Sequence, residues 1–308
     1  MPKSGNFSPA FLGSLTPATT VDIHADDFAL SENSDSDILQ LCAECKLDSI
    51  SIIPNLEYFE TASAKFLSIQ EKLNKKLLVS VHLNFMEGKC CAEKSLLPDL
   101  VDSEGFFTVS WGKFFMWNYI PFMRKKIKLQ LKTEILAQIK KCLDSNIIDK
   151  NAIRIDSHQH PHMIPVVFEA LKEVVFELEN DGCKIEYIRN AQDPILLYGG
   201  NNIFSINTVK CLILNFYSIK VKKYLVSKKL PVNYLCGVYF SGKMDSRLKK
   251  VLPKFIKKAE RHNRNIELLF HPGTMLKSEL TSEFKKEGFN EFHLSENRKI
   301  EYNTLKEL

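Results

Sequence analysis

The segment VDIHADDF, residues Val21–Phe28, decides the fold. Its pattern predicts a short β-strand over residues 20–25, which runs into two adjacent carboxylates, Asp26 and Asp27. A dinucleotide-binding sheet carries a glycine-rich turn after its first strand, and this segment contains no glycine. The phosphate-binding pattern G-x-x-x-x-G-K-[ST] is also missing from the sequence. A barrel is therefore favoured over a nucleotide-binding sheet.

Strand-like and helix-like patterns alternate along the rest of the chain. This alternation predicts parallel strands joined by helical crossovers, so we expect the α/β class and a distorted (β/α) barrel. Residues 86–113 follow neither pattern, and a functional loop is expected there. Further strands are expected at 49–53, 77–83, 152–155, 184–188, 234–240 and 266–270. Helices are expected at 38–46, 56–73, 129–143, 166–178, 208–230 and 248–261, with two more in 276–308.

The composition is that of a folded globular protein. Of the 308 residues, 44% are hydrophobic and 26% are charged, which excludes collagen-like, mucin-like and wholly disordered chains. The formal net charge of +5 is small for this length and does not indicate nucleic-acid binding. No apolar run is long enough to predict an integral membrane segment. We expect a flexible leader over residues 1–19 and a single catalytic domain over residues 20–308.

The eight cysteines are scattered along the chain. The N-terminal residues lack the basic and apolar regions of a secretory signal, so we expect reduced thiols and a cytoplasmic location. Cys42 and Cys45 form a C-x-x-C pair, but no second pair follows at zinc-finger spacing. This favours a packing role in a helix over a redox or zinc role.

Carboxylates and imidazoles recur where predicted strands end. In a parallel α/β barrel these ends open onto one face, and the chemistry of such proteins is built there. Residues from distant segments are therefore expected to meet at one rim. The residues concerned are Asp26, Asp27, His82, Asp156, His158 and His271.

These residue types suit a divalent metal. Two neutral imidazoles and one carboxylate leave coordination positions open for water and substrate, as a catalytic site requires. A further carboxylate then serves as general base and another histidine as general acid. Local alternatives stay open: Asp26 and Asp27 also suit a turn or a helix cap, and His82 also suits a hydrogen-bonded core position.

The segment DSHQHPH, residues 156–162, contains three alternating histidines directly after a predicted strand. We favour a functional cluster over a solvated loop. His158 is the candidate ligand, while His160 and His162 are expected to face substrate or to support the ligands. Arg189 ends another predicted strand, where it either binds substrate or forms a structural ion pair.

At these residues the chain resembles the YdjC-like (ChbG-type) carbohydrate deacetylases. HADDFALS resembles the family pattern N-A-D-D-F-G-x-S, and SVHLN resembles G-x-H-x-x. DSHQHPH is similar to D-S-H-x-H-x-H, and FHPG contains the late H-P-G pattern. Three positions differ from the family, namely His24, Ala29 and Ser80, and Ala29 stands where the backbone favours glycine.

The resemblance implies a distorted (β/α) barrel related to the NodB-like deacetylases. It also implies a divalent metal, Mg²⁺ or Zn²⁺, and hydrolysis of an N-acetyl group on an amino sugar. Carried over by position, Asp27, His82 and His158 are the metal ligands. Asp26 is then the general base and His271 the candidate general acid.

Other interpretations stay open. The basic and apolar stretch 208–230 would suit a membrane surface and a lipid-linked or otherwise decorated glycan. A non-catalytic carbohydrate-binding barrel is a further alternative. Trp111 and Trp117 either stack on a sugar ring or pack in the core. The sugar, the choice between Mg²⁺ and Zn²⁺, and a homodimeric state are not decided by the sequence.

Overall fold

The computed structural model describes residues 19–199 and 205–308, so the expected leader lies outside the described residues except for Thr19. Within these ranges seven strands form one parallel sheet in the order β5-β4-β3-β2-β1-β7-β6. The strands are β1 (Val21–Phe28), β2 (Ser49–Ile52), β3 (Leu78–Leu83), β4 (Ile153–Ser157), β5 (Ile185–Ile188), β6 (Tyr234–Cys236) and β7 (Ile266–Phe270).

The strand order is that of a barrel opened between β5 and β6. Apart from β5 and β6, strands that follow one another in sequence are neighbours in the sheet, and β7 returns to pair with β1. β5 and β6 do not pair as strands. The Leu235 amide of β6 donates to the carbonyl of Gln192, which follows β5, at 2.9 Å, and this bond links the two edges of the open barrel. The expected distorted (β/α) barrel is confirmed.

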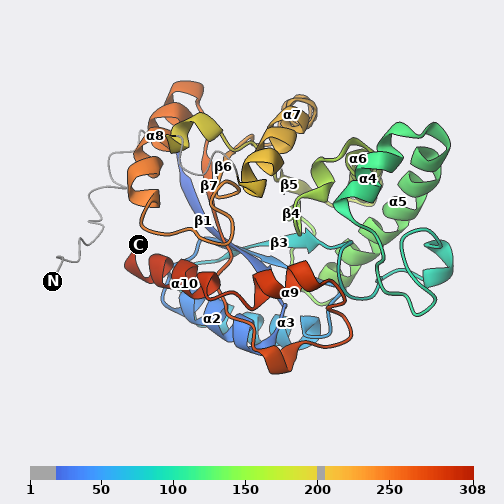
Figure 1. The fold of residues 1–308 in the computed structure, drawn as a ribbon, viewed down its shortest axis with the longest axis horizontal. Helices are drawn as coiled ribbons and strands as arrows, with labels where there is room; N and C mark the ends of the chain where they lie inside the picture. Colours follow the sequence, from blue (N-terminus) through green and yellow to red (C-terminus); the bar gives the residue numbers. More distant parts are fainter. Residues whose placement is uncertain (1–18, 200–204) are drawn as a thin grey trace.

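Helices surround the strands, with α2 and α3 below the sheet in Figure 1, α7 and α8 above it, and α4, α5 and α6 to the right. The crossover helices are α2 (Glu32–Ala43), α3 (Phe59–Gln70), α4 (Trp111–Tyr119), α5 (Pro121–Asp144), α6 (Pro165–Asn180), α7 (Ile206–Ser227) and α8 (Leu248–His262). The C-terminal helices are α9 (Glu287–His293) and α10 (Asn297–Glu307), so the tail is helical in two pieces as expected. In the described part of the chain, no helix is both long and apolar enough to cross a membrane.

Several boundaries differ from expectation; α2, for example, begins at Glu32 rather than at 38. Helix α4 was not predicted, and α5 begins at Pro121 rather than at 129. Ser110 caps α4 by accepting the Lys113 amide at 3.3 Å, and Pro121 suits a first helical position because its missing N–H is not needed there. Strand β6 ends at Cys236 rather than at 240, because Gly237 turns the chain at φ +150°. A Cβ at Gly237 would lie 2.5 Å from the Leu269 carbonyl oxygen, so only glycine fits this turn.

The C-x-x-C pair does not form a site. The Cys42 side chain is buried in the hydrophobic core, and Cys45 is exposed. Burial raises the pKa of Cys42 to about 12, so its thiol stays protonated at neutral pH. Among the described residues, the clusters that could hold a metal contain no cysteine.

Candidate active site

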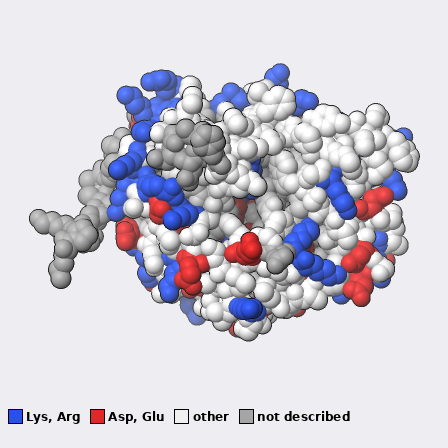
Figure 2. Space-filling view, in the orientation of Figure 1, with Lys and Arg blue, Asp and Glu red and all other residues white. Residues whose placement is uncertain are grey.

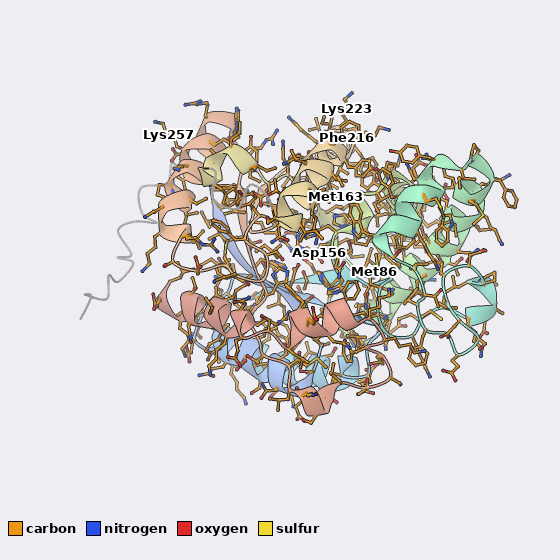
Figure 3. All side chains as sticks on the ribbon, in the orientation of Figure 1. Met86, Asp156, Met163, Phe216, Lys223 and Lys257 are labelled. Carbon is orange, nitrogen blue, oxygen red and sulfur yellow. The ribbon has the colours of Figure 1, made fainter. Side chains whose placement is uncertain are left out.

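The predicted rim residues come together at the carboxyl ends of the strands. Asp26 and Asp27 lie at the end of β1, and His82 lies in β3 beside Asp156 of β4, its register partner. The other three, His158, Arg189 and His271, directly follow β4, β5 and β7. Asp156 is labelled near the middle of the strands in Figure 3.

Both Asp26 and Asp27 reach the site, although neighbouring side chains of a regular strand point to opposite faces. The pairing of β1 with β2 shifts register between Ala25 and Phe28, and Asp27 adopts φ +66°. Ala29 adopts φ +73°, a conformation that glycine takes without strain. Two residues after Asp27, the chain therefore holds a second left-handed conformation at an alanine.

Asp27, His82 and His158 form one buried cluster of possible metal ligands. Asp27 Oδ1 lies 2.8 Å from His158 Nδ1 and 3.4 Å from His82 Nε2. Donors bound at roughly 2.1 Å to one ion lie about 3.0 to 3.4 Å apart, depending on coordination geometry. His82 Nε2 is buried and has no hydrogen-bond partner, as a metal-binding nitrogen requires. The donor set therefore fits a divalent cation; the Asp27–His82 distance lies within this range, and the Asp27–His158 distance is slightly shorter.

Charge also favours a cation at this cluster. In the described chain the buried carboxylates around it outnumber the buried guanidinium groups. The acids are Asp26, Asp27, Glu87, Asp156 and Glu267, and the bases are Arg189 and Arg298. Burial alone would lower the pKa of His82, but Asp26 and Asp156 raise it to about 10. Buried charge of one sign needs compensation, which a proton on His82 or a bound metal supplies.

Asp26 is held by Arg189 and His24. The Arg189 guanidinium donates to both Asp26 oxygens, at 2.8 and 2.9 Å, and His24 Nε2 lies 3.0 Å from Oδ1. Burial opposes ionisation of Asp26, but Arg189 and His82 hold its pKa well below the usual range. Arg189 also pairs with Glu267 and Asp156, and it is fully buried. Arg189 thus joins three buried carboxylates, those of Asp26, Asp156 and Glu267.

His271 is the most exposed of the predicted site residues, with 11% of its side chain accessible. Its Nε2 lies 4.0 Å from Asp26 Oδ2, and its Nδ1 lies 3.7 Å from Glu301 Oε2. Phe292 of α9 packs edge-on against the imidazole ring, with the centroids 5.5 Å apart. His271 thus lies on the solvent side of the cluster, with Asp26 beneath it.

His160 and His162 lie near the ligands without joining them. His162 Nε2 contacts the Arg189 carbonyl at 2.9 Å, and Nδ1 contacts the Ser157 hydroxyl. Burial lowers the pKa of His162 to about 4, so the ring is neutral and supports the Arg189 backbone. Burial, Lys210 and Arg189 also hold the pKa of His160 well below its usual range. Neither residue belongs to a described cluster that could hold a metal.

Glu87 and His293 are residues that sequence reasoning missed. His158 Nε2 lies 3.3 Å from Glu87 Oε2, and His293 Nε2 of α9 lies 3.0 Å from the same oxygen. Burial opposes ionisation of Glu87, but His293 and His158 lower its pKa to about 2. His158 therefore lies between two carboxylates, Asp27 at Nδ1 and Glu87 at Nε2. The only sequence signal was that Glu87 lies in the long segment expected to be a functional loop.

Arg298 and Lys210 were also missed. Arg298 of α10 donates to Asp27 Oδ2 at 3.1 Å and to the Gly273 carbonyl at 2.6 Å, so the C-terminal helix reaches the site. Lys210 in the first turn of α7 is partly buried and interacts electrostatically with Asp26 and Asp27. No local pattern distinguished either residue from an ordinary surface cation.

The two tryptophans have different surroundings. Trp117 is buried and packs against Phe114 with the ring centroids 6.0 Å apart, which is a core position. Trp111 is partly buried, and its Nε1 donates to the Gln159 carbonyl at 3.0 Å. Trp111 thus stabilises the loop that carries the three histidines.

The fold and the rim site define an α/β barrel protein with a candidate metal centre at its strand ends. The chain belongs to the YdjC-like protein family, whose model matches residues 20–307. A carbohydrate deacetylase of Xenopus laevis is 26% identical over 171 residues, covering 53% of this chain and 50% of that protein. A carbohydrate deacetylase of Clostridium beijerinckii is 27% identical over 155 residues, covering 50% of this chain and 56% of that protein.

The matched region thus spans about half the length of these curated relatives. A solved structure from Enterococcus faecalis V583, described as that of a cellobiose-phosphate cleavage protein, aligns with a TM-score of 0.51 at 16% identity. The alignment covers 93% of this chain and 95% of that one. At this identity the likeness shows the fold alone.

Proposed function

We propose that this protein is a metal-dependent carbohydrate deacetylase that removes an N-acetyl group from an amino sugar and releases acetate. The observation that carries the proposal is the buried Asp27–His82–His158 cluster, with Asp26 and His271 beside it. The names of the curated relatives supply the reaction class.

The metal would be held by Asp27 Oδ1, His82 Nε2 and His158 Nδ1, and when bound it would polarise the acetyl carbonyl and acidify a water molecule. Two imidazoles and one carboxylate suit Zn²⁺, and Mg²⁺ favours oxygen donors, so both metals belong in the test. Asp156 Oδ1, 2.6 Å from His82 Nδ1, fixes the ring so that Nε2 faces the cluster.

Asp26 is the proposed general base and His271 the proposed general acid. Asp26 is ionised at neutral pH, and Arg189 keeps its carboxylate in one orientation. Asp26 Oδ2 accepts the proton of the attacking water, and His271 Nε2–H donates to the departing amide nitrogen. Water and the amide thereby give acetate and the free amine. Arg189 orients the Asp26 carboxylate and does not bind substrate itself, because it is fully buried.

We also propose that residues 20–308 act as one catalytic domain. Asp27 comes from the first strand and Arg298 from the last helix, and the two side chains are joined at 3.1 Å. A cytoplasmic location is proposed on the eight cysteines, none of which forms a disulfide in the structure.

The test is acetate release from N-acetylglucosamine oligomers by the purified chain, with chelator and with Zn²⁺ or Mg²⁺ restored. We expect chelator-sensitive release. Asp26→Asn should retain metal and lose about 100-fold or more in kcat, the scale of general base catalysis. Full activity in Asp26→Asn would exclude its role as base, and release that chelation does not affect would exclude the metal.

A further inference from the structure

Helix α7 carries an apolar stripe that faces solvent. A crossover helix normally turns its apolar side to the barrel and its polar side to water. In α7 the inner side is apolar, with Leu214, Val221 and Leu225 buried, and the outer side is apolar as well. Phe216 is 66% exposed on that outer side. The exposed stripe consists of Ile206, Val209, Leu212, Phe216, Ile219 and Val226, which follow helical spacing over the length of α7.

A second exposed apolar set adjoins α7. It lies on α4 and at the start of α5 and consists of Phe115, Met116, Tyr119, Ile120 and Phe122. A continuous row of aromatic side chains joins the two sets. Phe115 packs on Tyr119 at 5.2 Å between centroids, the Tyr119 hydroxyl lies 3.5 Å from that of Tyr217, and Tyr217 packs on Phe216 at 5.6 Å. We call the two sets together the α4–α7 face.

The segments that carry the α4–α7 face are basic, and the acid beside them is Glu169 of α6, which pairs with Arg124 and lines a pocket with Tyr217 and Lys220. Residues 194–244 contain seven lysines and no Asp or Glu, and residues 105–133 contain basic residues and no acid. Lys220, Lys222 and Lys223 are exposed on α7 and form no ion pair with any described residue. In Figure 2 the surface over α7 is mostly white with blue at its upper edge, and Figure 3 shows Phe216 and Lys223 at the outer end of α7, away from Asp156.

This combination selects among possible partners. Nucleic acid offers phosphates but little apolar surface, so it would leave the exposed aromatic groups unmatched. A second copy meeting this face with its own would bring the unpaired lysines together, and like charges oppose such a contact. An anionic lipid surface matches both features, because apolar side chains enter the acyl boundary while lysines meet the headgroups.

We propose that the α4–α7 face binds the surface of an anionic lipid bilayer and holds the protein there as a peripheral protein. The absence of a membrane-crossing helix among the described residues agrees with attachment at the surface. The face lies next to the loop of the three histidines, because α7 packs against the short helix Pro161–Met163. The proposal does not rest on the reaction, since binding is measured without substrate.

The test is cosedimentation of the full chain with phosphatidylcholine vesicles that contain or lack phosphatidylglycerol. We expect binding to the anionic vesicles that weakens as salt is added. Phe216→Ser combined with Ile219→Ser should weaken binding about tenfold or more, because two exposed apolar anchors are removed. Lys220→Gln and Lys223→Gln should each weaken it about fivefold.

Phe176→Ser is the matched control. Phe176 is 62% exposed, close to the value for Phe216, but it lies on α6 outside the α4–α7 face, where Glu173 and Glu177 pair with Lys128 and Lys132. Its loss should leave vesicle binding unchanged, and thermal unfolding by circular dichroism confirms that each variant folds.

The proposal is overturned if the chain does not sediment with anionic vesicles, if it binds neutral vesicles equally well, or if Phe176→Ser weakens binding as much as the double variant. It is also overturned if the chain forms a dimer that the Phe216→Ser/Ile219→Ser variant abolishes, since the face would then bind a second copy.

Discussion

Two carboxylate–histidine pairs support the candidate metal ligands, and they are built in different ways. His82 and Asp156 are register partners on adjacent strands, and their contact at 2.6 Å is set by the pairing of β3 with β4. His158 and Glu87 come from two loops, and Glu87 is held in turn by His293 of the C-terminal helix α9. The first pair is part of the barrel, while the second depends on segments that pack over its end.

The difference predicts how each pair responds to substitution. In the strand pair, Asp156 also binds Arg189, whose guanidinium holds Asp26 and Glu267. A substitution at Asp156 should therefore also disturb the ion pairs of Asp26 and Glu267. The loop pair has fewer partners, so a substitution at Glu87 should affect mainly the position of His158.

Asp156→Asn should have the largest effect. It removes the charge that supports His82 and one partner of Arg189, so we expect metal affinity to fall about 100-fold. The free energy of unfolding should fall by about 3 kcal/mol, because a buried ion network is broken. Titration calorimetry with Zn²⁺ or Mg²⁺ and urea unfolding measure the two quantities. Asp22→Asn, which removes the partner of Arg154 outside the cluster, should leave metal affinity intact. Equal effects on affinity would contradict the assignment.

Glu87→Gln should lower metal affinity about tenfold with a smaller change in the unfolding free energy. The reason is that the His158 ring loses the carboxylate that supports its Nε2, while the barrel strands are unaffected. Calorimetric titration and urea unfolding again separate the two effects. Glu93→Gln, in the same loop and exposed, is the control. A loss of stability as large as that of Asp156→Asn would remove the distinction between the two pairs.

His293→Gln should have a smaller effect on metal affinity than Glu87→Gln, within about tenfold of the parent. His293 bonds Glu87 and meets the proposed ligand His158 through a ring contact, with the centroids 5.9 Å apart, so its loss leaves the contact between Glu87 and His158 in place. The double variant should lose little more metal affinity than Glu87→Gln alone, because His293 acts on the metal site through Glu87. Simple addition of the two losses would mean that α9 acts on the site independently of Glu87.

Ala29→Gly should have the smallest effect. Residue 29 lies two positions after Asp27, the carboxylate that lies close to both candidate histidine ligands. Relief of the strained φ of +73° outweighs the added freedom of the unfolded chain, so the unfolding free energy should rise by about 1 kcal/mol. Chemical denaturation measures this change. Ala64→Gly on the exposed side of α3 should lose about 1 kcal/mol instead, because its backbone is helical. A loss at Ala29→Gly would show that the backbone at residue 29 is not strained.

The same contrast explains which residues could be predicted. Asp26, Asp27, His82, Asp156, His158 and His271 were accessible because each follows a strand pattern, and parallel strands end on one face. Glu87, His293 and Arg298 carry no such signal. They lie in a loop and in two C-terminal helices, and their approach to the site is a consequence of packing over the barrel end.

Helix α4 was missed for a local reason. Its sequence, WGKFFMWNY, is apolar on nearly every side, and Phe115, Met116 and Tyr119 remain exposed. A helix is recognised from one apolar face repeated at helical spacing, and that contrast is lost here. The outer apolar stripe of α7 also weakens the contrast between an apolar and a polar helix face. The length of the pattern in α7 nevertheless indicated a helix.

The α/β alternation, the position of the rim residues and the family pattern could be predicted from the amino-acid order, because strand ends and motifs are local properties of the chain. The packed fold was needed to see that Asp27 turns inward through a left-handed backbone, that Arg189 clamps Asp26 rather than meeting solvent, and that Glu87 contacts His158. These features depend on distances between segments far apart in the chain. They are set by how the loops and the C-terminal helices pack on the barrel, which no local pattern encodes.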